Sequence, residues 1–176
     1  KAGGQTILPD GDRRMIDGTV FFAGGGIKEH GLPGINWRVV VEYAPEIAAV
    51  HKKAYGSTPT VKNVTEFVNT DEDLERIPKN GYFTASPVCK NFSPINKHVG
   101  DSNLDIVTAE AVAKVITERT PAIFTLENVR EYAFPPKKGG KDQPTEALDI
   151  ITRALDEGGY TWQGQVYDAA DFGAPT

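Results

Sequence analysis

Short apolar runs alternate with segments of helical periodicity along the whole chain. Strands are predicted where β-branched and aromatic residues cluster, at residues 19–23, 37–42, 60–64, 81–85 and 121–126. Helices are predicted where apolar residues recur every three or four positions, in a short stretch ending at Gly31 and at residues 45–56, 71–77, 104–115 and 147–155. A last strand is expected within residues 160–167.

The order of these elements predicts the fold class. Alternating strands and helices are typical of an α/β domain with a doubly wound parallel sheet, whose ligands bind beyond the carboxyl ends of the strands. The runs 37–42 and 121–126 are nearly continuous, as expected for strands buried on both faces. Prolines and glycines in residues 134–144 break both periods, so we expect a mobile loop there. We interpret residues 1–176 as a single domain.

Composition narrows the setting in which the protein works. The 176 residues carry a formal net charge of −5 and include one cysteine, so no internal disulfide can form. No apolar stretch approaches the roughly 20 residues of a membrane span, and we expect a soluble, cytoplasmic protein with no membrane partner. The acidic balance argues against a chain that grips nucleic acid unaided. The histidines have no metal-ligand spacing, so we predict no metal site and assign them to surface or loop positions: His30, His51 and His98.

Unusual residues follow four of the predicted strands. Three glycines, Gly24–Gly26, follow the first strand, and Glu42 ends the second. A glycine-rich turn admits close approach of a ligand, and an acidic residue can accept hydrogen bonds from a ribose diol, so the pair predicts an adenosine-type cofactor. Both a nicotinamide dinucleotide and S-adenosylmethionine satisfy this pattern. Cys89, after the fourth strand, is either a nucleophile or a small buried hydrophobe.

Five segments, in order, resemble successive motifs of the DNA cytosine-5 methyltransferases. They are residues 22–26 (FAGGG), 42–43 (EY), 87–93 (PVCKNFS), 127–129 (ENV) and 168–175 (DAADFGAP). The resemblance covers most of the chain and implies a Rossmann-like, S-adenosylmethionine-dependent methyltransferase sheet. It also implies methyl transfer to carbon 5 of cytosine in DNA.

The family's chemistry assigns roles to the residues after the fourth and fifth strands. Cys89 would add as a thiolate to carbon 6 of cytosine, which makes carbon 5 able to attack the methyl group of the cofactor. An ordinary thiol is only a few per cent ionised at neutral pH, so the site must favour the thiolate or remove its proton. Glu127 would contact the ring nitrogen beside the attacked bond and neutralise the developing charge. Asn128 is expected to hold its loop.

The resemblance also implies the binding residues. Those for S-adenosylmethionine, whose product is S-adenosylhomocysteine, are Phe22, Ala23, Gly24, Gly26, Glu42, Tyr43, Asn63, Val64 and Pro87. Those for the target base are Pro87, Ser93 and Asn128. Because the reacting carbon is hidden in the duplex stack, the substrate would be double-stranded DNA with a flipped cytosine, and the loop 90–100 would close over it. A bacterial enzyme of this kind would associate with the nucleoid and often serve restriction–modification.

The sequence departs from the family pattern at three positions. Val88 stands where a second proline usually precedes the cysteine, which loosens the backbone there. Lys90 replaces a usual glutamine beside the flipped base, and Ile27 replaces a usual glycine in the cofactor turn. We interpret these changes as divergence within the family.

After residues 168–175 the family continues with base-binding residues, a further core strand and a target-recognition region. The run 160–167 would pair with that strand, so we expect a sheet that is incomplete at its C-terminal edge, without a target-recognition domain. A missing C-terminal segment or a second polypeptide would complete the enzyme. Two other functions stay open: a cofactor-binding, complementing subunit without turnover, and a nucleotide-dependent oxidoreductase. The oxidoreductase is disfavoured because it needs neither Cys89 nor Glu127.

Overall fold

A computed structural model describes residues 15–88, 103–133 and 145–173 of the chain. The chain divides into two compact units, of which the first comprises residues 1–85 and 121–126 and the second residues 86–120 and 127–176. The expected loops 90–100 and 134–144 lie outside the described residues.

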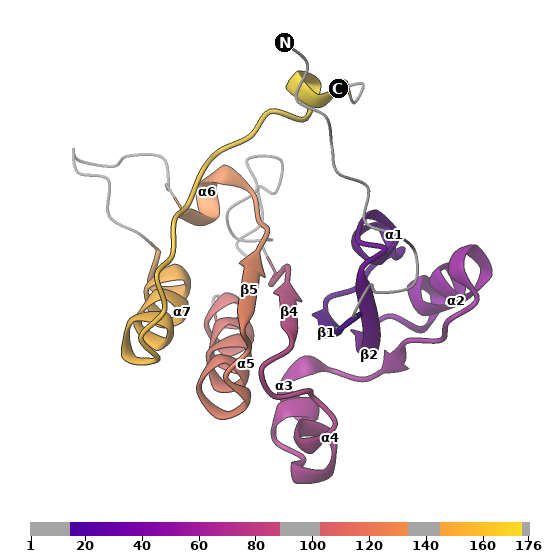
Figure 1. The fold of residues 1–176 in the computed structure, drawn as a ribbon, viewed down its shortest axis with the longest axis horizontal. Helices are drawn as coiled ribbons and strands as arrows, with labels where there is room; N and C mark the ends of the chain where they lie inside the picture. Colours follow the sequence, from indigo (N-terminus) through magenta and orange to yellow (C-terminus); the bar gives the residue numbers. More distant parts are fainter. Residues whose placement is uncertain (1–14, 89–102, 134–144, 174–176) are drawn as a thin grey trace. The chain divides into compact units, whose positions relative to one another are not determined.

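The first unit contains a five-stranded sheet in which every neighbouring pair of strands is parallel (Figure 1). The strands are β1 (Ile16–Phe21), β2 (Ile35–Glu42), β3 (Thr60–Val61), β4 (Tyr82–Ala85) and β5 (Ile123–Leu126). Their spatial order is β3-β2-β1-β4-β5, so the chain reverses its direction of growth at β1. The doubly wound fold is confirmed, and β1 is the switch point beside which such sheets bind ligands.

The core of this sheet is aromatic. Phe21 at the end of β1 is fully buried and packs edge-on against Phe83 of β4, with ring centroids 5.2 Å apart, and against Phe67, at 5.7 Å. Edge-to-face packing of this kind adds about 1 kcal/mol per pair to the free energy of burial. The last residue of β1 is thereby fixed, and the turn that follows it starts from a rigid point.

Two strands are less buried than their apolar runs suggest. In β2 only Val39 and Val41 are buried, Val40 between them is half-buried, and Arg38 before them is exposed. In β5, Ile123 is 51% exposed, and within the described residues β5 forms one edge of the sheet. The prediction that both strands are buried on both faces was therefore wrong, because a strand is covered on both faces only when helices pack over each one.

Four helices belong to the first unit: α1 (Ile27–Gly31), α2 (Pro45–Tyr55), α3 (Val64–Val68) and α4 (Asp71–Glu75). As predicted, α2 begins at a proline and ends before Gly56, whose φ of 77° forms a left-handed C-cap. Its buried residues are Ala48 and His51, so the assignment of His51 to the surface was wrong. The predicted strand 60–64 is shorter, because the Asn63 side chain caps α3.

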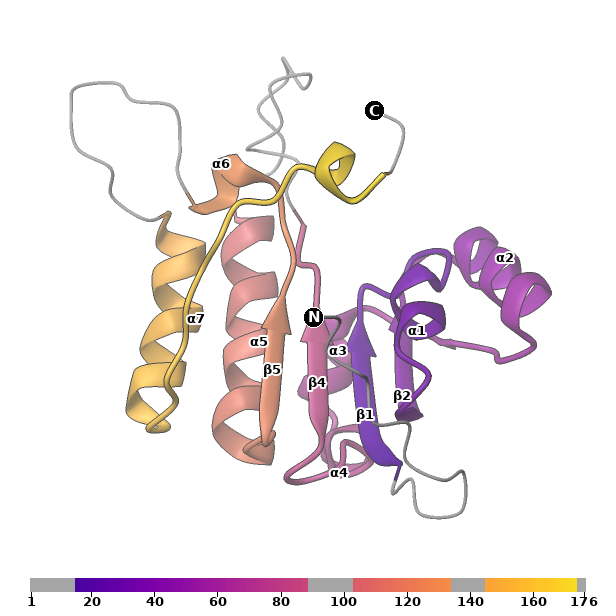
Figure 2. The ribbon, with the colours of Figure 1, turned by 45° about the horizontal axis from the view of Figure 1, so that its top comes forward.

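The second unit contains α5 (Leu104–Arg119), α6 (Arg130–Ala133), α7 (Glu146–Glu157) and the 3₁₀ helix η1 (Ala169–Phe172). Helices α5 and α7 lie side by side (Figures 1 and 2). Buried residues such as Val112 on α5 and Ile151 on α7 form the core between them. The Thr145 hydroxyl begins α7 by accepting from the Leu148 backbone N–H at 3.2 Å. None of the described helices is both long and apolar enough to cross a bilayer.

The last predicted strand is absent from the described structure. Residues 160–167 form no strand, and side chains such as Val166 (54%) and Tyr167 (66%) are exposed. A β-rich run becomes a strand only when a neighbouring strand accepts and donates its backbone hydrogen bonds. The described residues supply no such neighbour for this run.

Candidate functional site

The turn after β1 adopts a backbone that few residues tolerate. Gly24 has φ of 58° and Gly26 has φ of 87°, so both glycines are left-handed. Phe22, which is not a glycine, also has φ of 58°, a conformation that costs about 1–2 kcal/mol. The Gly26 N–H donates to the Ala23 carbonyl at 3.2 Å and closes the turn. Strain of this kind is found mainly where a ligand or a reacting group requires it.

Glu42 links this turn to the end of β2. Its side chain accepts from the Gly24 N–H through Oε2 at 2.9 Å and from the Ala44 N–H through Oε1 at 2.9 Å. Two bonds from backbone amides hold the carboxylate at the carboxyl ends of two adjacent strands. A carboxylate has about four acceptor directions, so two remain for a ligand.

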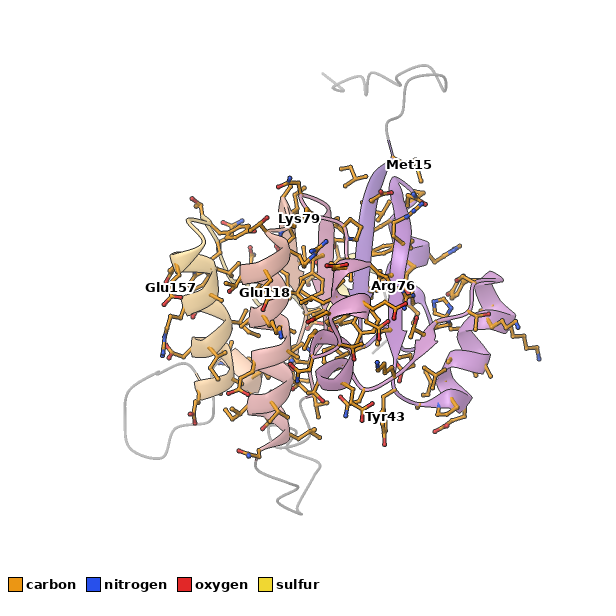
Figure 3. All side chains as sticks on the ribbon, turned by 90° about the horizontal axis from the view of Figure 1, so that it is seen from below. Met15, Tyr43, Arg76, Lys79, Glu118 and Glu157 are labelled. Atoms are coloured by element: carbon orange, nitrogen blue, oxygen red, sulfur yellow. The ribbon has the colours of Figure 1, made fainter. Side chains whose placement is uncertain are left out.

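The residues around Glu42 fit an adenosine-type cofactor. A methyl group added at Gly24 or Gly25 would meet no atom within 4 Å, so the outer side of the turn is open. The Tyr43 ring is 71% exposed and projects beyond the carboxyl end of β2, opposite the end at which Met15 lies (Figure 3). Open backbone, a spare acceptor and an exposed aromatic face can receive the methionine chain, the ribose and the adenine of such a cofactor. Ala23 is buried beneath the turn at 6% exposure.

The end of β3 brings Asn63 and Val64 to the same edge of the sheet. β3 pairs with β2 at Glu42, and the Lys62 N–H donates to the Glu42 carbonyl at 3.1 Å. The Asn63 Oδ1 accepts from both the backbone N–H and the hydroxyl of Thr65, at 3.0 and 2.9 Å. Both acceptor directions of that oxygen are thus used in the helix cap, which leaves the Nδ2 amide to meet a ligand. Val64 is buried, at 4% exposure.

A second group of residues follows β4 and β5. Ala85 and Leu126 pair in register, and the residues that come directly after them are Ser86 and Glu127. In the second unit the Ser86 hydroxyl donates to Glu127 Oε2 at 2.8 Å, and this carboxylate is exposed. A parallel pair of strands thus delivers a hydroxyl and an acid into contact.

Asn128 ties the same two segments together through its amide. Its Nδ2 donates to the Pro87 carbonyl at 3.0 Å, and its Oδ1 accepts from the Val129 N–H at 2.9 Å. Pro87 is buried. The predicted role of Asn128 in holding its loop agrees with these two bonds. The predicted residues Cys89 and Ser93 lie outside the described residues, and Cys89 follows Pro87 by two positions in the sequence.

Ser86 was not among the predicted site residues. Ser86 directly follows β4, and Glu127 directly follows the parallel neighbour β5. This arrangement predicts that the hydroxyl and the acid meet, but only once the register of β4 and β5 is known. Among the described residues no group of three or more histidine, cysteine or acidic side chains could hold a metal ion.

The fold defines a class: a doubly wound α/β domain, in which the ends of β1 to β3 fit an adenosine-type cofactor. Comparison with known proteins gives the family. The family model of the C-5 cytosine-specific DNA methylases matches residues 16–176, so the chain belongs to this family.

Individual relatives agree with this assignment. The Type II methyltransferase M.AquIA of Picosynechococcus sp. is 27% identical over 161 residues, which are 88% of this chain and 65% of the relative. Among solved structures, the Dnmt2 methyltransferase of S. pombe superposes with a TM-score of 0.54 at 14% identity, covering 82% of this chain and 41% of that one. A putative prophage-encoded DNA modification methyltransferase of E. coli gives a TM-score of 0.54 at 16% identity, covering 80% and 37%. This chain therefore spans less than two thirds of each relative's length.

Proposed function

We propose that this chain carries the cofactor-binding and catalytic residues of an enzyme that methylates carbon 5 of cytosine in double-stranded DNA. The observation that carries the proposal is the contact of 2.8 Å between the Ser86 hydroxyl and the Glu127 carboxylate. Ser86 precedes Cys89 by three residues in the sequence. Three residues of extended chain span at most about 11 Å, so the only thiol of the chain is tethered close to the segment that contacts Glu127. Family membership supplies the reaction in which a thiol and an acid cooperate on a pyrimidine.

In this reaction the Cys89 thiolate adds to carbon 6 of the flipped cytosine and forms a carbon–sulfur bond. Electron density moves through carbons 5 and 4 to ring nitrogen N3, where Glu127 donates or shares a proton. Carbon 5 would then attack the methyl group supplied by S-adenosylmethionine, which would leave as S-adenosylhomocysteine. N3 returns its proton to Glu127, a base removes the proton from carbon 5, the carbon–sulfur bond breaks, and the Cys89 thiolate is regenerated.

The cofactor occupies the edge formed by β1, β2 and β3. Glu42 accepts hydrogen bonds from the ribose hydroxyls with the two acceptor directions that its backbone bonds leave free. Tyr43 stacks on the adenine, Phe22, Ala23, Gly24 and Gly26 surround the methionine and ribose, and Val64 and Pro87 border the site. Asn63 meets the adenine through its Nδ2 amide, because its Oδ1 is used by Thr65.

Further polypeptide completes the enzyme, either in the same chain or as a second subunit. Support comes from β5, which is an edge strand with Ile123 51% exposed, and from the run 160–167, which forms no strand. Each relative is also longer than the part that this chain matches. This need for completion favours one alternative: a cofactor-binding, complementing subunit without turnover of its own.

Trapping with 5-fluorocytosine separates the two functions. The full chain is incubated with S-adenosylmethionine and a pool of random duplexes in which every cytosine carries fluorine, so that the target sequence need not be known. Fluorine at carbon 5 blocks the final elimination, and an active Cys89 stays covalently bound to DNA on a denaturing gel. Because the chain has one cysteine, Cys89→Ser should abolish the adduct without ambiguity.

The cofactor half of the proposal is measured separately, by calorimetric titration with S-adenosylmethionine. Binding without an adduct, with the completing polypeptide present, would favour the complementing subunit over the enzyme. Absence of S-adenosylmethionine binding together with binding of a nicotinamide dinucleotide would overturn both.

A further inference from the structure

The short helix that follows the cofactor turn is not held by an apolar face. Helix α1 has five residues, none of which is buried as a whole, and its first residue, Ile27, is 80% exposed. A helix of this length has no stability of its own in water, so contacts outside it must fix its position. These contacts also fix Gly26, which is the N-cap of α1.

One buried polar pair joins α1 to α2. Glu29 Oε1 lies 3.0 Å from His51 Nε2, and the two side chains are 7% and 0% exposed. On the other side of the ring, His51 Nδ1 lies 3.2 Å from the Ser57 carbonyl. The Ser57 hydroxyl lies 3.5 Å from the same nitrogen. The carbonyl can only accept, so its contact is a hydrogen bond when Nδ1 carries a proton, whereas the hydroxyl can also donate.

The ring contact with Glu29 also requires a proton. The contact between Nε2 and Oε1 is a hydrogen bond when a proton lies on Nε2 or on Oε1. The other carboxyl oxygen, Oε2, is buried and has no hydrogen-bond partner among the described residues, which is costly. The bond to His51 is the side-chain contact that offsets this burial.

The pair lies directly behind the cofactor turn. A methyl group added at Gly26 would come within 2.7 Å of the His51 ring and would overlap the Tyr55 ring. The Tyr55 ring packs edge-on against His51, with ring centroids 5.5 Å apart. The Gly26 carbonyl in turn accepts from the His30 N–H at 3.2 Å. The turn is therefore held by Glu42 on one side and rests on these rings on the other.

We propose that Glu29 and His51 are positioning residues for the methyl donor, which lock the turn Gly24–Gly26 in the conformation that binds S-adenosylmethionine. The inference rests on the proposed function, because it takes S-adenosylmethionine as the ligand of this turn. Neither side chain touches the cofactor. Their hydrogen bond fixes α1 on α2, and α1 carries the turn.

Calorimetric titration of the full chain with S-adenosylmethionine tests the pair through three variants. Glu29→Ala and His51→Ala should each weaken binding at least tenfold, and the double variant should bind no more weakly than His51→Ala, because that variant already loses both the bond and the ring on which the turn rests. Glu29→Gln should bind within about threefold of the wild type, since its amide N–H can donate to the Nε2 lone pair of neutral His51. The control is Ile151→Val, which trims a buried side chain on α7 and should lower the unfolding midpoint while leaving affinity unchanged.

Each outcome points one way. Wild-type affinity in both alanine variants would overturn the inference, and so would equal losses in Glu29→Gln and Glu29→Ala. A wild type that does not bind S-adenosylmethionine would overturn the proposed function instead. A measurement on the wild type keeps the test independent of folding in the variants: proton–nitrogen spectra of the His51 imidazole, together with the carboxyl carbon shift of Glu29, should show a proton on Nε2 or on the carboxyl group, and a bare Nε2 beside a deprotonated Glu29 would overturn the pair.

Discussion

The two candidate carboxylates are held in different ways. Glu42 is partly buried and accepts from two backbone amides within one compact unit. Glu127 is exposed and accepts from the Ser86 side-chain hydroxyl. The main chain holds a backbone amide in place, whereas a serine hydroxyl can turn about its own bond. The comparison indicates that the proposed cofactor-binding carboxylate is held by backbone donors before any ligand arrives, while the proposed catalytic carboxylate has a contact that can rearrange.

The largest expected effect is on turnover, from Glu127→Gln. The amide can still bond to Ser86 but cannot give a proton to the cytosine ring, so turnover should fall by about 10²- to 10³-fold. Affinity for S-adenosylmethionine, measured by calorimetry, should stay within about twofold. A loss of cofactor affinity as large as the loss of turnover would show that Glu127 also supports cofactor binding, and the two carboxylates would then not have separate roles. Glu157→Gln, at an exposed position on α7, serves as the control.

Glu42→Gln should produce the opposite pattern. One side-chain oxygen is replaced by an amide donor that faces a backbone N–H, so one of the two backbone bonds is lost. S-adenosylmethionine affinity should fall about 10- to 100-fold, and the free energy of unfolding should fall by about 1–2 kcal/mol. Calorimetric titration measures the loss of cofactor affinity, and chemical denaturation measures the loss in the free energy of unfolding. Unchanged cofactor affinity would exclude Glu42 from the site.

Ser86 sharpens the comparison from the catalytic side. Ser86→Ala removes the donor to Glu127, and turnover should fall about tenfold, the value of one lost hydrogen bond of about 1.4 kcal/mol. Ser86→Thr keeps a hydroxyl at the same position and should recover most of the rate. Steady-state kinetics at saturating S-adenosylmethionine distinguishes the two variants. Equal activity in all three proteins would mean that the hydroxyl does not position the acid.

The sequence predicted the positions of strands and helices more reliably than their burial and their pairing with neighbouring strands. The positions of β1, β4 and α2 follow from local apolar patterns, which a single segment carries within itself. The burial of β5 and the pairing of residues 160–167 depend on neighbouring strands that no local pattern encodes. The strand-like run of β1 was therefore predicted correctly, whereas the strand predicted within residues 160–167 was wrong.

The site shows the same division. The strand ends were predicted at the right positions in the chain: Gly24 lies in the turn after β1, Glu42 ends β2 and Glu127 follows β5. The functional roles of these residues stay predictions. The partners of these residues were not predicted. The contact of Glu29 with His51 joins positions 22 residues apart, and a histidine on a helix gives no sign of burial until its neighbours are known.

A third carboxylate, Asp73, provides the smallest test. It accepts from Lys62 Nζ at 2.7 Å and from Arg76 Nη1 at 2.8 Å, and hydrogen bonds from these cations, Lys62 first, lower its pKa below the ordinary 3.8. A carboxyl group with a lowered pKa in the folded state stabilises the protein above the unfolded pKa, and this contribution is lost as the pH falls through the folded value. Asp73→Asn should therefore cost about 0.5–1 kcal/mol at pH 7, the range of surface ion pairs, and almost nothing well below pH 3.8.

Denaturant unfolding at several pH values measures this difference, and the exposed Glu72→Gln in the same turn of α4 is the matched control for the helix dipole. Cofactor affinity should not change in either variant, because Asp73 is bound to side-chain cations rather than to the amides of the turn. A cost for Asp73→Asn that persists unchanged at low pH would show that packing, and not charge, holds this residue. A loss of S-adenosylmethionine binding in Asp73→Asn would show that the structure supporting Glu42 extends through β3 to α4. The difference in how Glu42 and Glu127 are held would then be a property of the whole first unit and not of the Glu42 side chain alone.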